Sequence, residues 1–310
     1  MTSLDGALNG YDLFGEPIVT KKTGPVSEMF GFPPFSVLDA RQGAWQERKR
    51  AWLGVGIKSE EGRDAPCNAA LLRPFLGNRD RMVDKATSVF DPTLCECVYR
   101  WFTAPGAQIV DPFAGGSVRG IVAGMLGRHY WGCDLRQEQI DANNTQADTI
   151  APDVRPEWVC GDSMATLDNA PDADFIFSCP PYGNLEKYSD DPADLSAMEW
   201  HTFKVAYARI ILRAVKRLKQ NRFACFVVGD FRDNRGFYRD FVSSTIAAFR
   251  DAGAELYNEA ILATPLGNAA MRAPAFRIGR KFVKTHQNVL IFCKGDWRKA
   301  SEELNKTDFL

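Results

Sequence analysis

From residue 83 onwards, short apolar runs alternate with longer amphipathic stretches, and this alternation constrains the fold more than any other feature of the sequence. Apolar runs of strand length predict seven strands, at 107–110, 129–135, 157–162, 174–179, 223–230, 259–266 and 286–295. Stretches with helical periodicity predict helices at 117–126, 138–150, 196–218 and 238–253. Strands that alternate with helices are usually parallel and buried on both faces. We therefore expect an α/β fold with a mainly parallel, seven-stranded sheet.

The two ends of the predicted sheet differ in character. The last two strands have no helix between them, which predicts an antiparallel hairpin at one edge. Residues 1–82 lack the alternation and are rich in glycine, proline and charged residues. At roughly 150 residues per domain, the chain has room for one large domain or two smaller ones. We interpret residues 83–310 as one folded catalytic domain and residues 1–82 as an N-terminal extension.

The predicted extension places basic residues among aromatic ones. Arg48, Lys49 and Arg50 lie between Trp45 and Trp52. One interpretation is a solvated surface helix. The other is an arm that contacts nucleic acid through charge and stacking. The second interpretation makes Arg48, Lys49 and Arg50 candidate nucleic-acid-binding residues.

Composition excludes several classes of protein. With 45% hydrophobic and 25% charged residues, the chain is an ordinary globular protein. Its 38 lysine and arginine residues balance 39 acidic ones, which argues against a nucleic-acid coat protein but not against an enzyme with a local basic patch. No apolar run is long enough to cross a membrane, and the N-terminal residues lack the pattern of a secretory signal. The eight cysteines fit neither a disulfide scaffold nor a zinc site, so we expect a cytoplasmic protein with reduced cysteines and no metal.

Acidic residues and glycines follow the first three predicted strands. Asp111 precedes a turn that contains Gly115 and Gly116, and a nucleotide-like ligand of a doubly wound sheet lies at such a turn. An ordinary tight turn has the same composition. Asp134 can bind ribose hydroxyls or cap a helix, and Asp162 can bind an adenine amine or cap a turn. The fingerprints of dinucleotide and phosphate loops are absent, which argues against NAD and ATP.

A second motif follows the fourth predicted strand and gives the sequence a family resemblance. Residues 179–182 read Cys-Pro-Pro-Tyr, 68 residues after the Asp-Pro-Phe-Ala-Gly-Gly of 111–116. In this order, the two motifs resemble those of amino-methyltransferases, which transfer a methyl group from S-adenosylmethionine to the exocyclic amine of adenine or cytosine. Longer strings at 33–52, 185–196 and 284–296 are similar to phage-encoded modification methyltransferases. A phage origin would place the protein in the host cytoplasm.

The resemblance implies a Rossmann-like methyltransferase fold and a set of site residues. It covers most of residues 83–296 and includes the segment 88–92, which corresponds to the part that holds the methionine end of the donor. The residues implied to bind S-adenosylmethionine are Phe90, Asp111, Phe113, Gly115, Gly116, Asp134 and Asp162. The residues implied to hold the target base are Cys179, Pro180, Pro181 and Tyr182.

The chemistry of an exocyclic amine explains the second motif. The lone pair of this amine is delocalised into the base, so its hydrogens must be drawn toward acceptors before it can attack a methyl group. Proline offers no N–H donor of its own and leaves backbone carbonyls to accept those hydrogens. The ring of Tyr182 can stack on a base taken out of the helix. The family has Asp, Asn or Ser before Pro-Pro, whereas this chain has Cys179, preceded by Ser178.

A basic segment lies between the last two predicted strands. No Asp or Glu occurs between Ala260 and Gly295. A solvated hairpin is one interpretation, and a loop at about 266–286 that contacts phosphates is the other. Under the second interpretation, further candidate nucleic-acid-binding residues are Arg272, Arg277, Arg280, Lys281 and Lys284.

Together these features predict a DNA methyltransferase that uses S-adenosylmethionine and modifies an exocyclic amine, with adenine slightly favoured over cytosine. The expected partner is DNA. Two alternatives stay open at this point: an RNA amino-methyltransferase, and a nucleic-acid-binding protein with an inactive site. Cys179 keeps the second alternative open, because a thiol is a weak hydrogen-bond acceptor.

Overall fold

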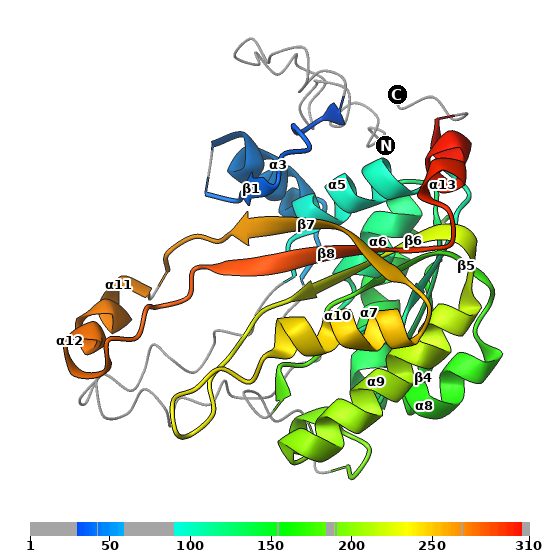
Figure 1. The fold of residues 1–310 in the computed structure, drawn as a ribbon. Helices are drawn as coiled ribbons and strands as arrows, with labels where there is room; N and C mark the ends of the chain where they lie inside the picture. The colour runs from blue at the N-terminus through cyan, green and yellow to red at the C-terminus, as the bar shows by residue number, and fades with distance from the viewer. Residues whose placement is uncertain are drawn as a thin grey trace.

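A single eight-stranded sheet forms the centre of the fold (Figure 1). The structure is a computed structural model, and it describes residues 30–41, 43–58, 90–153, 155–183, 189, 191–267 and 269–305. The strands are β1 (Val37–Asp39), β2 (Gln108–Asp111), β3 (His129–Asp134), β4 (Glu157–Cys160), β5 (Ala173–Ser178), β6 (Leu218–Val228), β7 (Glu255–Ala263) and β8 (His286–Lys294). The helices are α3 (Gly43–Gly54), α5 (Pro92–Phe102), α6 (Val118–Met125), α7 (Gln137–Ile150), α8 (Ser163–Thr166), α9 (Trp200–Arg217), α10 (Phe241–Asp251), α11 (Ala269–Arg272), α12 (Phe276–Gly279) and α13 (Trp297–Leu304).

The strand order confirms the predicted mainly parallel α/β sheet of Rossmann-like type. The order is β1-β7-β8-β6-β5-β2-β3-β4. The pairings of β2 with β3 and β5, of β3 with β4, and of β5 with β6 are parallel. β8 is antiparallel to both neighbours, β6 and β7, so the predicted antiparallel pair is also confirmed.

The predicted number of seven strands is wrong, because an additional strand comes from the segment interpreted as an extension. β1 is three residues long and pairs in parallel with β7 at the edge of the sheet. One more strand, β1, therefore lies outside the antiparallel pair β7–β8, at the edge of the sheet. A strand this short shows no alternation of polar and apolar residues, so its sequence carries no recognisable signal.

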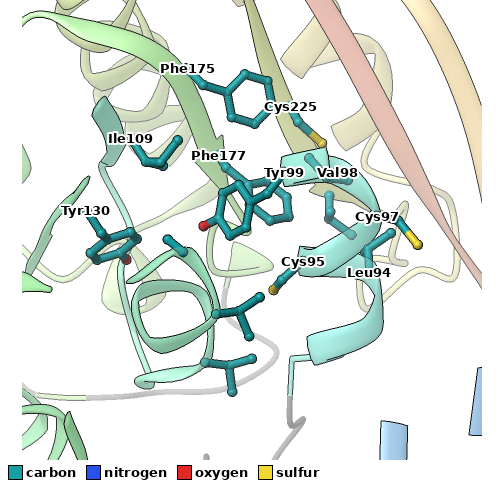
Figure 2. Packing of buried hydrophobic residues seen from close by; sticks show 14 of the residues in the cluster. Leu94, Cys95, Cys97, Val98, Tyr99, Ile109, Tyr130, Phe175, Phe177 and Cys225 are labelled. Atoms are coloured by element: carbon teal, nitrogen blue, oxygen red, sulfur yellow. The ribbon is translucent and has the colours of Figure 1, made fainter. Parts of the chain in front are cut away.

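Helices cover both faces of the sheet, and the central strands alternate their side chains between them. Ile109 and Phe175 belong to the core beneath α5 and α6, whereas Val110 and Ile176 belong to the core beneath α9 and α10. Figure 2 shows the first of these cores, where Tyr99 of α5 lies against β5. The Tyr99 and Phe177 rings meet edge to face at 5.3 Å between centroids.

The described part of the N-terminal segment packs into the same core. Trp45 and Trp52 of α3 are buried. Arg48 forms two hydrogen bonds of 2.6 Å to Glu96 of α5, and Trp52 Nε1 donates to the same carboxylate at 2.7 Å. Burial would raise the pKa of Glu96, but the hydrogen bond and charge of Arg48 outweigh it and hold that pKa below its usual value. The predicted boundary at residue 82 lies outside the described residues.

Candidate active site

A cavity of about 370 Å³ opens at the carboxyl ends of the parallel strands. It is lined by residues that directly follow or end β2, β3, β4 and β5, because these ends meet at one edge of the sheet. The predicted site residues that line it are Phe90, Phe113, Gly115, Asp134, Asp162, Cys179, Pro180, Pro181 and Tyr182. Of the residues implied to bind the cofactor or the target base, Asp111 and Gly116 do not line it. Lys49, predicted to bind nucleic acid, also lines this cavity. Ser88 and Val89, part of the segment implied to hold the donor, lie outside the described residues.

Asp134 holds the glycine turn in place. Its Oδ2 accepts a hydrogen bond from the Gly115 backbone N–H at 3.0 Å, and its Oδ1 accepts one from the Arg136 N–H at 3.0 Å. Gly115 has a φ of 51°, a left-handed conformation that favours glycine. The N-cap residue of α7 is Arg136, so the side chain of Asp134 does not cap that helix. Asp134 therefore presents its carboxylate at the cavity wall.

Asp162 has the predicted capping role and also lines the cavity. Its Oδ1 accepts a hydrogen bond from the Met164 N–H at 2.8 Å, which makes it the N-cap of α8. It also lines the cavity beside Gly161. The cap fixes the direction of a carboxylate that a ligand can reach.

Asp111 lies beneath the cavity and organises its floor. The residue is fully buried. Oδ1 accepts hydrogen bonds from Ser178 Oγ at 2.5 Å and from the Phe113 N–H at 3.0 Å. Oδ2 accepts from Tyr130 Oη at 2.7 Å and from Arg119 Nε at 2.6 Å. These bonds link Asp111, the last residue of β2, to Tyr130 of β3, to Ser178 at the end of β5, to Arg119 of α6 and to the glycine turn.

Arg119 is a site residue that sequence analysis missed. Its side chain is 5% exposed and lines the cavity. Nη2 donates to the carbonyls of Phe113 and Ala114 at 2.6 and 2.8 Å, and the guanidinium lies 4.6 Å from the Phe90 ring centroid. Burial opposes its charge, but the Asp111 carboxylate outweighs burial and raises the pKa of Arg119. The signal available in the sequence was one arginine in an otherwise apolar helix.

The Cys179–Tyr182 motif forms the opposite wall of the cavity. Tyr182 packs edge to face against Phe241, with 5.8 Å between ring centroids. Its hydroxyl accepts a hydrogen bond from Gln287 Nε2 of β8 at 2.6 Å. Burial raises the pKa of Tyr182 well above its usual value, with a further contribution from Cys179, so the phenol stays neutral. Gln287 also lines the cavity and is a second residue that sequence analysis missed.

The two residues before the prolines point in different directions. Ser178 is buried and donates to Asp111, whereas Cys179 is partly exposed and lines the cavity. Successive side chains of a strand alternate between its faces, which explains the difference. Ser178 therefore cannot replace Cys179 at the cavity wall.

The basic segment forms an arm that projects from the sheet. Figure 1 shows α11 and α12 at the tip of this arm, beyond the ends of β7 and β8. Its exposed cations are Arg272, Arg277, Arg280 and Lys281. Lys284 is half-buried at the base of the arm, where burial lowers its pKa and its Nζ donates to the Asp230 carbonyl at 3.4 Å.

A loop next to the arm carries arginine–aromatic pairs that sequence analysis did not single out. It spans residues 229–240, between β6 and α10. The Arg232 guanidinium lies 4.0 Å from the Tyr238 ring centroid, and that of Arg235 lies 5.7 Å from Phe237. Phe237 is 67% exposed. A side chain at Gly236 would collide with the Lys281 amine, so the arm and this loop are in contact.

The basic residues of the N-terminal segment are differently placed. Arg48 is paired with Glu96, and Lys49 Nζ lies 3.3 Å from Asp91 Oδ2. Arg50 is exposed. Within the described ranges, no cluster of histidine, cysteine and acidic side chains could hold a metal ion. The helices in those ranges are all too short or too polar to cross a membrane.

No family model matches the sequence. TrmN from Thermus thermophilus is similar in structure, with a TM-score of 0.46, 15% identity and coverage of 66% of this chain and 49% of that one. Magnesium protoporphyrin IX methyltransferase from Synechocystis, with bound SAM, has a TM-score of 0.43 and 11% sequence identity. The match covers 66% of this chain and 79% of that one. A protein from Thermus thermophilus described as a candidate DNA modification methylase has a TM-score of 0.34 and 17% sequence identity. The match covers 44% of this chain and 51% of that one. The chain spans about half the length of TrmN.

Proposed function

We propose that this chain is a methyltransferase that uses S-adenosylmethionine to modify an exocyclic amine of DNA. One observation carries the proposal. The same cavity is lined by the glycine turn and acidic strand ends on one side and by Cys179–Tyr182 on the other. A methyl donor and a base can therefore meet within one cavity.

The lining residues fit the cofactor. Asp134 and Asp162 offer carboxylates where β3 and β4 end, suited to ribose hydroxyls and an adenine amine. Gly115 brings the backbone close, and Phe90 and Phe113 supply apolar surface. The volume of about 370 Å³ falls within the usual range of small-molecule sites. When bound, the cofactor supplies an electrophilic methyl group on a sulfonium.

The residues of the opposite wall fit an amine-bearing base. Pro180 and Pro181 have no N–H, so no backbone donor from either competes with the amine hydrogens for acceptors. Tyr182 is fixed by Gln287 and by the aromatic residues behind it, which gives the base a rigid surface. These residues act by aligning the amine with the methyl group and need no covalent bond to the base.

The arm supports DNA as the partner. Its stretch without acidic residues presents Arg272, Arg277, Arg280 and Lys281 to solvent, and phosphates are the natural ligand for such a surface. Lys284 continues the cations from the arm toward Tyr182, since its Nζ and the Tyr182 ring lie 3.1 and 3.8 Å from the position of a Cβ on Gly229. We favour adenine over cytosine as the target base.

The test of the proposal is methyl transfer. Purified protein with tritiated S-adenosylmethionine should label DNA, and sequencing of DNA from cells that express it should show modified adenines in a fixed sequence context. Labelling of RNA alone would replace DNA with RNA as the substrate. Donor binding without transfer to either nucleic acid would favour the inactive binding protein.

Cofactor affinity should depend on Asp134. Asp134→Ala removes charge-assisted hydrogen bonds to the ribose, worth about 1.5–3 kcal/mol, or roughly tenfold to hundredfold in affinity. Calorimetric titration with S-adenosylmethionine measures the effect. Asp141→Ala, on the exposed face of α7, is the matched control and should bind normally. Equal affinities for both variants would remove Asp134 from the binding site.

The arm should supply salt-dependent, largely sequence-independent affinity. Neutralising Arg277, Arg280 and Lys281 should lower the slope of log K against log salt by about 0.9 for each phosphate that the arm no longer neutralises. Fluorescence anisotropy with a duplex at several salt concentrations measures the slope. Neutralising three exposed cations elsewhere, namely Lys216, Arg250 and Lys299, is the control. An unchanged slope in the arm variant would show that the arm faces away from DNA.

A further inference from the structure

Lys49 brings a positive charge from the N-terminal segment to the wall of the cavity. It lies on α3, and its side chain is 24% exposed. The position of α3 is fixed by the Arg48–Glu96 pair and by the hydrogen bond from Trp52 to Glu96. Lys49 therefore belongs to a helix that is held against α5.

Asp91 holds the Lys49 amine at this wall. Asp91 Oδ1 accepts hydrogen bonds from the backbone of Thr93 and Leu94, at 2.9 and 3.4 Å, and so caps α5. Asp91 Oδ2 accepts from Trp45 Nε1 at 3.2 Å and from Lys49 Nζ at 3.3 Å. The carboxylate is thus committed to four donors. A lysine amine carries three hydrogens, and Asp91 is its hydrogen-bond partner within the described residues.

The other two cations of the described cavity wall, Arg119 and Arg136, are placed differently. Arg119 is held by Asp111 and by the carbonyls of Phe113 and Ala114. Arg136 lies next to Asp134 at the β3 end, and its Nη2 donates to Gln139 at 3.1 Å. Lys49 is therefore the cation of the lining that is neither buried in an ion pair, as Arg119 is, nor placed at the β3 end, as Arg136 is.

Lys49 also lies on the correct side of the cavity. Asp134 and Asp162 mark the side of β3 and β4, where the nucleoside of the cofactor would bind. Phe90, next to Asp91, contacts Phe177 of β5 with 5.7 Å between ring centroids. β2 and its glycine turn separate the two sides. A cofactor with its nucleoside at Asp134 would extend its amino-acid end toward Phe90 and Lys49.

We propose that Lys49 binds the carboxylate at the amino-acid end of S-adenosylmethionine. The amine keeps Asp91 on one side and takes the cofactor carboxylate on the other, so the positive charge lies between two negative ones. This inference rests on the proposed cofactor. It assigns Lys49 to the cofactor instead of to nucleic acid, and it makes α3 a part of the cofactor site.

Two cofactor analogues test the inference without any transfer step. S-adenosylhomocysteine carries the amino-acid end, and 5′-methylthioadenosine has the same nucleoside and sulfur without it. Lys49→Met should weaken S-adenosylhomocysteine binding by roughly tenfold to hundredfold, the value of a lost charge-assisted hydrogen bond. Binding of 5′-methylthioadenosine should stay within about twofold of the parent protein, which also shows that the variant is folded. Lys299→Met, an exposed lysine on α13 at the far end of the molecule from the arm, is the matched control (Figure 1).

Calorimetric titration with the two analogues measures these affinities, and its outcomes distinguish the inference about Lys49 from the proposed function. Normal binding of S-adenosylhomocysteine by Lys49→Met overturns the inference and leaves the proposed function intact. Equal weakening of both analogues overturns it as well, because the lysine would then support the fold of the site and not the carboxylate. Failure of the parent protein to bind either analogue overturns the proposed function, and the inference with it.

Discussion

Tyr182→Ala should lower the single-turnover rate of methyl transfer by about a hundredfold or more. The substitution removes a stacking surface worth about 1–3 kcal/mol for the target base. It also removes the partner of Gln287 and opens space beside Phe231 and Phe241, so the amine loses its alignment with the methyl group. Cofactor affinity should change far less, because the nucleoside side of the cavity is formed by other strands.

Rapid-quench transfer to a methylatable duplex, with calorimetric cofactor affinity as the reference, measures this difference. Tyr257→Ala is a suitable control, since it replaces a partly exposed tyrosine on β7 that is not among the cavity residues. A Tyr182→Ala protein that transfers at the parent rate would show that the target base binds elsewhere.

Cys179 distinguishes this chemistry from a covalent mechanism. In amine methylation the amine attacks the methyl group directly, so Cys179→Ser should retain substantial activity. In methylation at a ring carbon a thiolate attacks the base, and the same change would be close to fatal. Ser178 cannot rescue the variant, because its hydroxyl is directed to the buried Asp111. Complete loss of transfer, together with an enzyme–DNA adduct in the parent protein, would overturn the amino-methyltransferase proposal.

Arg119→Met should lower the free energy of unfolding by about 3–5 kcal/mol, as expected when one partner of a buried ion pair is removed. Asp111 would keep its bonds to Tyr130 and Ser178 but would lose the charge that compensates its own. The carbonyls of Phe113 and Ala114 would lose their donor, so the glycine turn should loosen and cofactor binding should weaken.

Urea denaturation measures the change in stability. The matched control is Arg213→Met, which removes one partner of the exposed ion pair with Asp168 and should cost no more than about 1 kcal/mol. Arg119→Lys should fall between the parent and Arg119→Met, because an ammonium keeps the charge but not the planar fork of donors. Equal losses for Arg119→Met and Arg213→Met would refute the central role of the buried pair.

The sequence by itself determined the mainly parallel α/β architecture and the strand-end residues that line the cavity. Strands and helices were readable because burial imposes a local periodicity on each of them. The acidic residues at strand ends could be placed together because parallel strands present their carboxyl ends at one edge. Asp134, Asp162 and the Cys179–Tyr182 motif meet in one cavity for that reason.

Tertiary structure alone decided which side chains become partners across long separations in the chain. Gln287 and Tyr182 are 105 residues apart, and Arg48 and Glu96 are 48 apart. Local periodicity does not encode such pairs, so the sequence could not show that Lys49 reaches the cavity or that β1 extends the sheet. It also could not show that Asp111 lies below the cavity, because the direction of a side chain at the end of a strand depends on the elements packed around it.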